Sequence, residues 1–241
     1  MTSNEIKFVK SLQQKKFRDT SGLFVVEGEK LVAEALASPF QVEQVYRAQE
    51  IGEKAMERIS GLSSPSPVLA VVHRPEVPAL PEKPGKGLYL ALDGIRDPGN
   101  LGTILRIADW FGLDGIFASP DTAEVFAPKV VQATMGAIFR VRYRPAVDLA
   151  ALCRQVVGEG GAVYGTFLDG RNIYERPLSC GTERPSIIVI GNEAKGISPE
   201  VAAEVSDRLY IPPYPEGDPG SESLNAAVAT AITVAEFRRR R

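Results

Sequence analysis

The feature that most constrains the fold is an alternation of strand-like and helix-like segments over the last two thirds of the chain. After residue 87, short apolar runs alternate with longer stretches whose apolar residues recur every three or four positions. The expected strands cover 88–94, 115–119, 137–143, 162–167, 186–191 and 208–212, and the expected helices cover 100–112, 123–136, 146–160 and 223–237. This alternation predicts an α/β domain with a mostly parallel sheet and helices on both faces.

A smaller domain is expected before it. Its periodicities predict helices at 29–38 and 51–60 and strands at 42–46 and 67–73. A proline-rich stretch follows, with Pro75, Pro78, Pro81 and Pro84 spaced by three residues. Such spacing favours an extended, semi-rigid spacer. We therefore expect a small α/β domain at 1–74, a linker at 75–87 and a larger domain at 88–241.

The charge distribution is uneven, although the chain as a whole is near neutral. The net charge of −2 and the pI of about 5.7 are not those of a typical nucleic-acid-binding protein. Basic residues nevertheless gather at the N-terminus, on alternate positions of a predicted strand, and in an Arg run at 238–241. The first two groups are Lys7, Lys10, Lys15, Lys16 and Arg18, and Arg140, Arg142 and Arg144. Each cluster is either a contact surface for phosphates or solvated surface charge, and the three arginines would share one face of a strand.

Histidine and cysteine usage excludes several chemistries. His73 is the only histidine, and Cys153 and Cys180 are the only cysteines. A multi-histidine metal site, a cysteine zinc site and a disulfide scaffold are therefore excluded, and we expect no metal. No signal sequence and no apolar run of membrane-spanning length is present, so we expect a cytoplasmic protein without a membrane partner.

Three polar, glycine-containing loops follow predicted strands, where parallel sheets bind their ligands. In the first, Asn100 is a candidate N-cap for a helix whose apolar face lies nearly opposite Arg106. Gly102 leaves space one turn before that arginine. Arg106 is either a ligand for phosphate or carboxylate, which arginine binds bidentately, or a solvated helix residue beside a capped turn.

The second loop begins after the strand at 186–191, and the third follows the strand at 208–212. The second contains Gly191, Asn192, Glu193 and Gly196 but matches neither the Walker nor the dinucleotide fingerprint. In the third loop, Ser223 is the expected cap of the last helix and Asn225 is placed in its first turn. Asparagine is a poor residue inside a helix, so Asn225 is the stronger functional candidate of the two.

Taken together and in this order, the three loops resemble the SpoU/TrmH family of RNA ribose 2′-O-methyltransferases, within the SPOUT superfamily. The matching segments are DPGNLGTILRIA, IVIGNEAKGIS, and an Ile-Pro followed by SLNAAVA. The segment FAPKVVQATMGAIF is also similar to the family, with Thr134 where serine is more usual. One departure is that PYPEGDPG at 213–220 makes the third motif about four residues longer than is usual.

The resemblance implies a fold, a cofactor and a set of roles. The larger domain would carry a C-terminal trefoil knot, assemble as a homodimer, and transfer a methyl group from S-adenosylmethionine to a ribose 2′-hydroxyl without a metal. Arg106 would be catalytic, acting as a charge stabiliser or directly as base, with Asn100, Glu193 and Ser223 positioning it and the nucleotide. The donor pocket would comprise Gly191, Asn192, Gly196, Ile211, Leu224 and Asn225. The N-terminal domain would bind the RNA through its lysines and Arg18.

The substrate class has alternatives. Ribosomal RNA is favoured by the additional N-terminal domain, with transfer RNA second. A non-catalytic RNA-binding module is disfavoured by the intact Asn100, Arg106 and Asn225. A nucleotide-dependent oxidoreductase is disfavoured by the missing glycine fingerprint.

Overall fold

The computed structural model describes residues 1–75, 80–175, 177–178, 180–215 and 223–239. The chain forms two compact units. The N-terminal unit comprises residues 1–77 together with 124–140, and the C-terminal unit comprises 78–123 and 141–241. The N-terminal unit is therefore built from two stretches that are far apart in the sequence.

The C-terminal unit is organised around a six-stranded sheet in the order β6-β5-β4-β8-β7-β9, in which every neighbouring pair is parallel. Its strands are β4 (Gly87–Asp93), β5 (Gly115–Ala118), β6 (Tyr143–Arg144), β7 (Ala162–Asn172), β8 (Pro185–Gly191) and β9 (Asp207–Tyr210). The mostly parallel sheet predicted from the alternation is confirmed.

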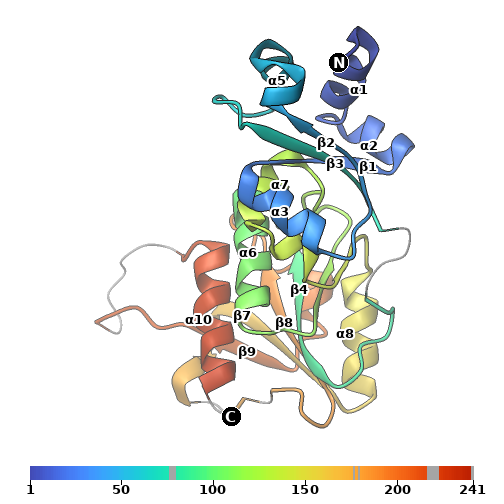
Figure 1. Ribbon diagram of the computed structural model, residues 1–241. Helices are drawn as coiled ribbons and strands as arrows, with labels where there is room; N and C mark the ends of the chain where they lie inside the picture. Colours follow the sequence, from blue (N-terminus) through green and yellow to red (C-terminus); the bar gives the residue numbers. More distant parts are fainter. Residues whose placement is uncertain (76–79, 176, 179, 216–222, 240–241) are drawn as a thin grey trace. The chain divides into compact units, whose positions relative to one another are not determined.

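Helices cover both faces of this sheet (Figure 1). They are α6 (Pro98–Trp110), α8 (Leu149–Gly158), α9 (Pro199–Ala202) and α10 (Ala226–Arg239), with a 3₁₀ turn η2 at Ile173–Glu175. Leu152 and Val156 of α8 pack against one face, which includes Val189. Helices α6 and α10 pack together, and α10 contacts β8. Because β4 and β8 are buried on both faces, they are continuously apolar rather than alternating.

The N-terminal unit contains an antiparallel three-stranded sheet in the order β1-β3-β2. Its elements before residue 75 are α1 (Ser3–Ser11), α2 (Lys15–Ser21), β1 (Leu23–Glu27), α3 (Glu29–Ala37), β2 (Val42–Arg47), α4 (Ala48–Ile51), α5 (Glu53–Ile59) and β3 (Val68–His73). The small antiparallel domain agrees with the small α/β domain expected from the sequence, although the sequence patterns did not predict α1, α2 and β1.

The second stretch of the N-terminal unit, residues 124–140, contains α7 (Pro128–Thr134) and the 3₁₀ turn η1 (Ala137–Phe139). Phe126 packs on Phe24 with ring centroids 4.9 Å apart. Glu124 accepts hydrogen bonds from both Nε and Nη2 of Arg18, the former over 3.1 Å. These contacts cover the outer face of β1, which explains why all five residues of β1 are buried.

The structure corrects the strand expected at 137–143. Residues 137–139 form η1, and β6 is limited to Tyr143–Arg144. The three arginines therefore do not share a strand face. Arg140 pairs with Glu34, and Arg142 lies 3.9 Å from Asp114. Arg144 donates to the carbonyl of Leu80 over 2.9 Å and pairs with Glu82.

Two expectations fall partly outside the described residues. The insertion at 213–220 is described only to residue 215, and the C-terminal Arg run only to Arg239. Across the described part of the chain, no helix has the length and apolarity needed to span a membrane.

Candidate functional site at the carboxyl ends of the parallel strands

The three loops singled out in the sequence meet at one edge of the parallel sheet. Asp93 at the end of β4 pairs with Gly191 at the end of β8, so the first two loops leave the sheet side by side. The third loop follows β9, which joins the sheet through β7. The common strand direction is the reason that segments a hundred residues apart converge.

Asparagine side chains connect all three loops directly. Asn100 Nδ2 donates a hydrogen bond to Glu193 Oε1 over 2.6 Å. Asn225 Nδ2 donates to Asn100 Oδ1 over 2.9 Å. Asn100 therefore uses both ends of its amide, one toward each neighbouring loop. We call Glu193, Asn100 and Asn225 the three-loop link.

The caps of the two helices differ from those expected. Helix α6 begins at Pro98 and is capped by Asp97, whose Oδ1 accepts from the backbone N–H of Asn100 over 2.7 Å. Helix α10 begins at Ala226 and is capped by Asn225, whose Oδ1 accepts from the N–H groups of Ala227 and Val228 over 2.9 and 3.2 Å. The expectation that Asn100 and Ser223 are the caps is therefore wrong. With Asp97 as the cap, the Asn100 amide is free to join the link.

The second loop is a tight turn whose shape requires glycine. A Cβ atom at Gly191 would lie 2.3 Å from the carbonyl carbon of Gly196. Gly196 itself has a φ of +70°, in the left-handed region that favours glycine. Asn192 fixes the turn, since its Oδ1 accepts from the N–H groups of Ala194 and Lys195 over 3.0 and 3.1 Å. Its Nδ2 donates to the carbonyl of Gly94 over 2.7 Å, which ties the turn to the end of β4.

Arg106 lies on the exposed side of α6, as the helical periodicity predicts. Its helix is buried through Leu101, Ile104, Leu105 and Ala108. Within the described part of the chain, the Arg106 guanidinium has neither a hydrogen-bond nor an ion-pair partner, whereas Arg96 nearby in the sequence pairs with Asp121. An exposed guanidinium without an internal partner is free to bind an anionic ligand.

The remaining predicted residues line the ends of the third loop. Ile211 follows β9 and is half-buried, while Ser223 and Leu224 are exposed. Ser223 takes no part in the three-loop link. A candidate that the sequence analysis missed is Leu168, which is 72% exposed on an irregularity of β7 beside Leu209 of β9. An apolar residue directly after the apolar run 162–167 was the available signal.

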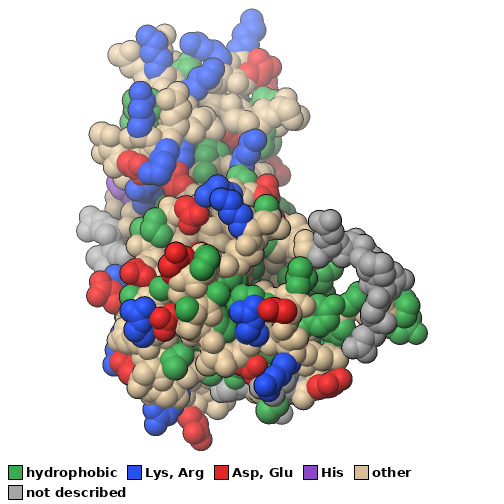
Figure 2. All heavy atoms as spheres, turned by 180° about the vertical axis from the view of Figure 1, so that it is seen from behind, with side chains coloured by type: hydrophobic (Ala, Val, Ile, Leu, Met, Phe, Trp, Pro, Cys, Tyr) green, Lys and Arg blue, Asp and Glu red, His purple; other side chains and the backbone are tan. Residues whose placement is uncertain are grey.

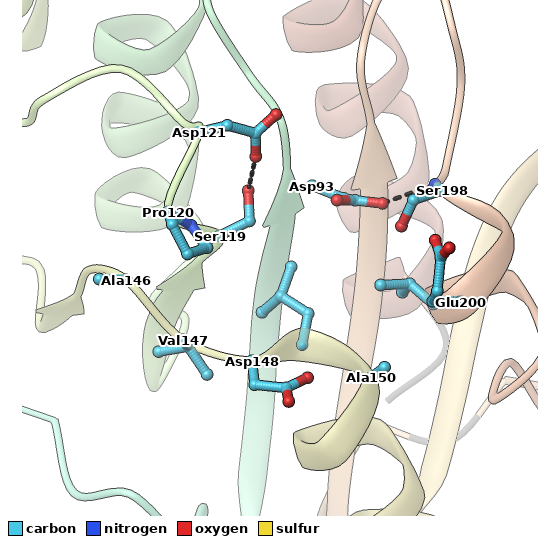
Figure 3. A pocket seen from close by; sticks show the side chains of 12 residues that line it. Asp93, Ser119, Pro120, Asp121, Ala146, Val147, Asp148, Ala150, Ser198 and Glu200 are labelled. Carbon is cyan, nitrogen blue, oxygen red and sulfur yellow. Dashed lines mark hydrogen bonds between the residues drawn. The ribbon is translucent and has the colours of Figure 1, made fainter.

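A separate cavity of about 520 Å³ lies on the α8 side of the same edge (Figure 3). Four carboxylates line it: Asp93, Asp121, Asp148 and Glu200. Asp93 accepts from the N–H of Ser198 over 2.7 Å. Ser119 Oγ donates to Asp121 over 2.7 Å, and this bond is the main cause that lowers the pKa of Asp121. The acidic lining disfavours a phosphate ligand, and none of the three-loop link contributes to the cavity.

The five basic residues predicted to bind RNA differ in their exposure to solvent. Lys7, Lys10, Lys15 and Lys16 are exposed. Arg18 is only 3% exposed, and besides Glu124 it donates to the carbonyl of Leu12 over 2.8 Å. Its guanidinium is therefore held inside the unit. Among the described residues, no group of three or more His, Cys, Asp or Glu side chains is placed to hold a metal ion.

Comparisons with known proteins agree with this architecture. Residues 87–235 match the model of the SpoU rRNA methylase family, and residues 3–71 match that of the MRM3-like substrate binding domain. The chain therefore belongs to the SpoU rRNA methylase family.

Individual relatives are similar over nearly the whole chain. The 23S rRNA (guanosine(2553)-2′-O)-methyltransferase RlmP of Bacillus subtilis is 32% identical, over 98% of this chain and 96% of the relative. A solved structure of a TrmH-family RNA methyltransferase from Porphyromonas gingivalis is 42% identical, with a TM-score of 0.87 over 100% of this chain and 99% of the other. An AdoMet-bound rRNA methyltransferase from Sinorhizobium meliloti is 30% identical, with a TM-score of 0.83 over 99% and 95%.

Proposed function

We propose that this protein is an S-adenosylmethionine-dependent methyltransferase that modifies a ribose 2′-hydroxyl in structured RNA, with ribosomal RNA as its substrate. The observation that carries the proposal is the three-loop link, together with an Arg106 on the same helix as Asn100 that has no partner among the described residues. Membership of the SpoU family and the ribosomal RNA substrate of the B. subtilis relative support it. Transfer RNA is the second candidate substrate.

The loops suit the proposed donor. The turn between Gly191 and Gly196 has no room for a side chain at its first position. Leu224 in the third loop and Leu168 on the irregularity of β7 expose apolar surface that suits a purine ring. We assign Gly191, Asn192, Gly196, Ile211, Leu224 and Asn225 to the donor pocket and add Leu168. When bound, the donor supplies a methyl group that is already activated by its sulfonium.

The chain's own residues must then orient the hydroxyl and stabilise the charge that develops on its oxygen. Arginine is protonated at neutral pH, so Arg106 suits the binding of an RNA phosphate and the stabilisation of an alkoxide better than it suits proton abstraction. That phosphate would share the proton as it leaves the hydroxyl, and direct base action by Arg106 is the alternative. Asn100 and Glu193 hold the first two loops in register, and Ser223 is assigned to positioning the nucleotide.

The oligomeric state, the knot and the cellular compartment are also part of the proposal. We propose a homodimer through α6 and α10, because Trp110 at the end of α6 is 83% exposed and Val228 on α10 is also exposed. A C-terminal trefoil knot is proposed as well; β8 lies between β4 and β7, both of which precede it in the chain. We further propose a cytoplasmic location, where the two free cysteines would stay reduced.

The experiment that tests the function is methylation of unmodified ribosomal RNA by the purified protein with isotope-labelled S-adenosylmethionine. Nucleoside mass spectrometry should find one 2′-O-methylated nucleoside, and a chelator should not reduce the rate. Transfer RNA serves as the competing substrate. Methylation of neither RNA, or label on a base instead of a ribose, would contradict the proposal.

A further inference from the structure

Two phenylalanine rings are exposed on the N-terminal helices, outside the core of their unit. Phe8 on α1 is 45% exposed and Phe17 on α2 is 38% exposed. Helix α1 packs against the unit through the buried residues Ile6 and Val9, followed by Leu12. More than a third of the surface of each residue therefore stays exposed in the folded unit.

Exposed lysines neighbour both rings in the sequence. Lys7 precedes Phe8 and Lys16 precedes Phe17 in the sequence, and both lysines are exposed. Neither lysine has an ion-pair partner in the part of the chain that the structure describes, nor has Lys10. Helix α5, which packs against α1, adds exposed basic residues at 54 and 58. Figure 2 shows Lys and Arg side chains gathered over the N-terminal helices, at the top of the view.

The Phe17 ring is already approached by a positive charge. Lys16 Nζ lies 4.7 Å from the centroid of the Phe17 ring, a cation–π contact at an exposed site. The ammonium group of Lys16 therefore lies over one face of the Phe17 ring. An exposed cation–π contact is weak, so the ammonium group can exchange to a phosphate and leave the face to a flat ligand.

We propose that Phe8 and Phe17 stack on unpaired bases of the RNA, while the neighbouring lysines bind its phosphates. Exposed aromatic faces interleaved with cations are the arrangement that binds single-stranded nucleic acid, since stacking requires a base face that a continuous duplex keeps covered. The N-terminal unit would thereby direct the protein to loops, bulges or strand ends. The inference rests on RNA being the substrate, and it names the class of RNA structure that this unit selects.

The test is RNA binding by the full-length protein, measured by fluorescence anisotropy with a hairpin that has an unpaired loop and with a fully paired duplex of matching length. Phe8→Leu and Phe17→Leu keep an apolar side chain but remove the aromatic ring. Phe8→Tyr and Phe17→Tyr keep the aromatic ring. We expect each leucine variant to weaken hairpin binding roughly 5- to 10-fold. The tyrosine variants should bind nearly as wild type, and duplex binding should change little.

Leu36→Ala removes a different exposed apolar side chain of the same unit and should leave both affinities unchanged. The salt dependence of binding separates base stacking from phosphate contacts. The leucine variants should keep the wild-type slope of log affinity against log salt, since no phosphate contact is lost. Equal binding of hairpin and duplex by wild type, or unchanged hairpin affinity in folded leucine variants, would overturn the inference while leaving RNA methylation intact. A change of oligomeric state in the leucine variants would show that the rings belong to a protein–protein interface, and this result would also overturn the inference.

Discussion

The two units use their polar side chains in opposite ways. In the C-terminal unit, side chains from loops a hundred residues apart converge in the three-loop link. Helix α6, which carries Asn100 of the link, also carries Arg106, which has no partner among the described residues. In the N-terminal unit, the long-range polar contacts stabilise the unit itself, as in the pair of Arg18 with Glu124, and the exposed lysines are spread over helix surfaces.

The difference follows from the two sheets. Parallel strands direct all their carboxyl-terminal loops to one edge, where side chains can be gathered for chemistry. An antiparallel sheet has no such common edge, and its helices instead offer an extended surface that suits binding. We therefore propose a separation of two tasks, in which the C-terminal unit transfers the methyl group and the N-terminal unit holds the RNA.

The largest effect is expected from Arg106. Arg106→Ala should reduce the single-turnover rate of methyl transfer roughly 100-fold or more, as for other groups that stabilise developing charge. Arg106→Lys should recover only part of this loss, because a point charge cannot replace the planar guanidinium. Donor affinity, measured by calorimetry, should be unchanged. Arg154→Ala, which removes an exposed arginine of α8, is the control and should react at the wild-type rate. A folded Arg106→Ala protein with normal turnover would place the chemistry on another residue.

A large effect on stability is expected from Glu124. Glu124→Ala leaves the buried Arg18 without its carboxylate, and breaking such a pair costs about 3 kcal/mol of unfolding free energy. Denaturant unfolding checks this, with Lys15→Gln as the control. Lys15 forms an exposed pair with Asp19, and its loss should cost less than about 0.5 kcal/mol. Equal effects of the two substitutions would show that residues 124–140 are not part of the N-terminal fold.

A moderate effect on turnover is expected from Asn100. Asn100→Ala removes both hydrogen bonds of the three-loop link and should slow methyl transfer about 10-fold by misplacing the loops. Thr103→Ala, on the same helix, is the control. Because Asn100 acts as a positioning residue, the RNA concentration at half-maximal rate should stay within about threefold. A loss confined to RNA affinity would instead indicate a direct contact with the substrate.

The smallest effects are expected from single lysines. Lys7→Gln, Lys10→Gln and Lys16→Gln should each weaken RNA binding slightly and reduce the slope of log affinity against log salt by about one. Binding isotherms over a series of salt concentrations measure this. Unchanged slopes in all three variants would mean that phosphates bind elsewhere.

Much of the fold was predictable, because it depends on local pattern. The apolar runs at 88–94 and 186–191 predicted buried parallel strands, and the convergence of the loops followed from the sheet type. The starts of the helices were less predictable, because neighbouring polar side chains compete for the capping position. The competing residues are Asp97 and Asn100 at α6, and Ser223 and Asn225 at α10. In both helices the residue directly before the first helical turn is the cap.

Contacts between distant segments were not predictable from local pattern. Within the expected strand, residues 139–143 alternate between apolar or aromatic and basic side chains, as an exposed strand would, but Phe139 packs on Phe40 of the N-terminal unit with ring centroids 5.2 Å apart. Likewise, nothing in the spacing of the N-terminal cations distinguished Arg18, which is buried against Glu124, from the exposed lysines. The catalytic and donor-binding roles of the loop residues stay predictions.

Because residues 124–140 belong to the N-terminal unit, a deletion of residues 1–74 is a poor test of the division of tasks. Deleting residues 1–74 would be expected to weaken RNA binding and spare donor binding, but it would also uncover Phe126 and leave Glu124 without Arg18. Point variants in the intact chain avoid this, because they change one contact at a time and leave both units folded.

The most direct test of the division of tasks is to measure, for the same RNA, the single-turnover rate at saturating RNA and the dissociation constant. Two proteins are compared with wild type: Arg106→Ala, and the triple variant Lys7→Gln/Lys10→Gln/Lys16→Gln. We predict that Arg106→Ala loses at least about 100-fold in rate even when RNA is saturating, and that the triple variant binds RNA more weakly but keeps its rate at saturating RNA within about threefold of wild type. A triple variant that binds RNA as wild type, or an Arg106→Ala protein whose defect disappears at saturating RNA, would contradict the separation of chemistry from RNA binding.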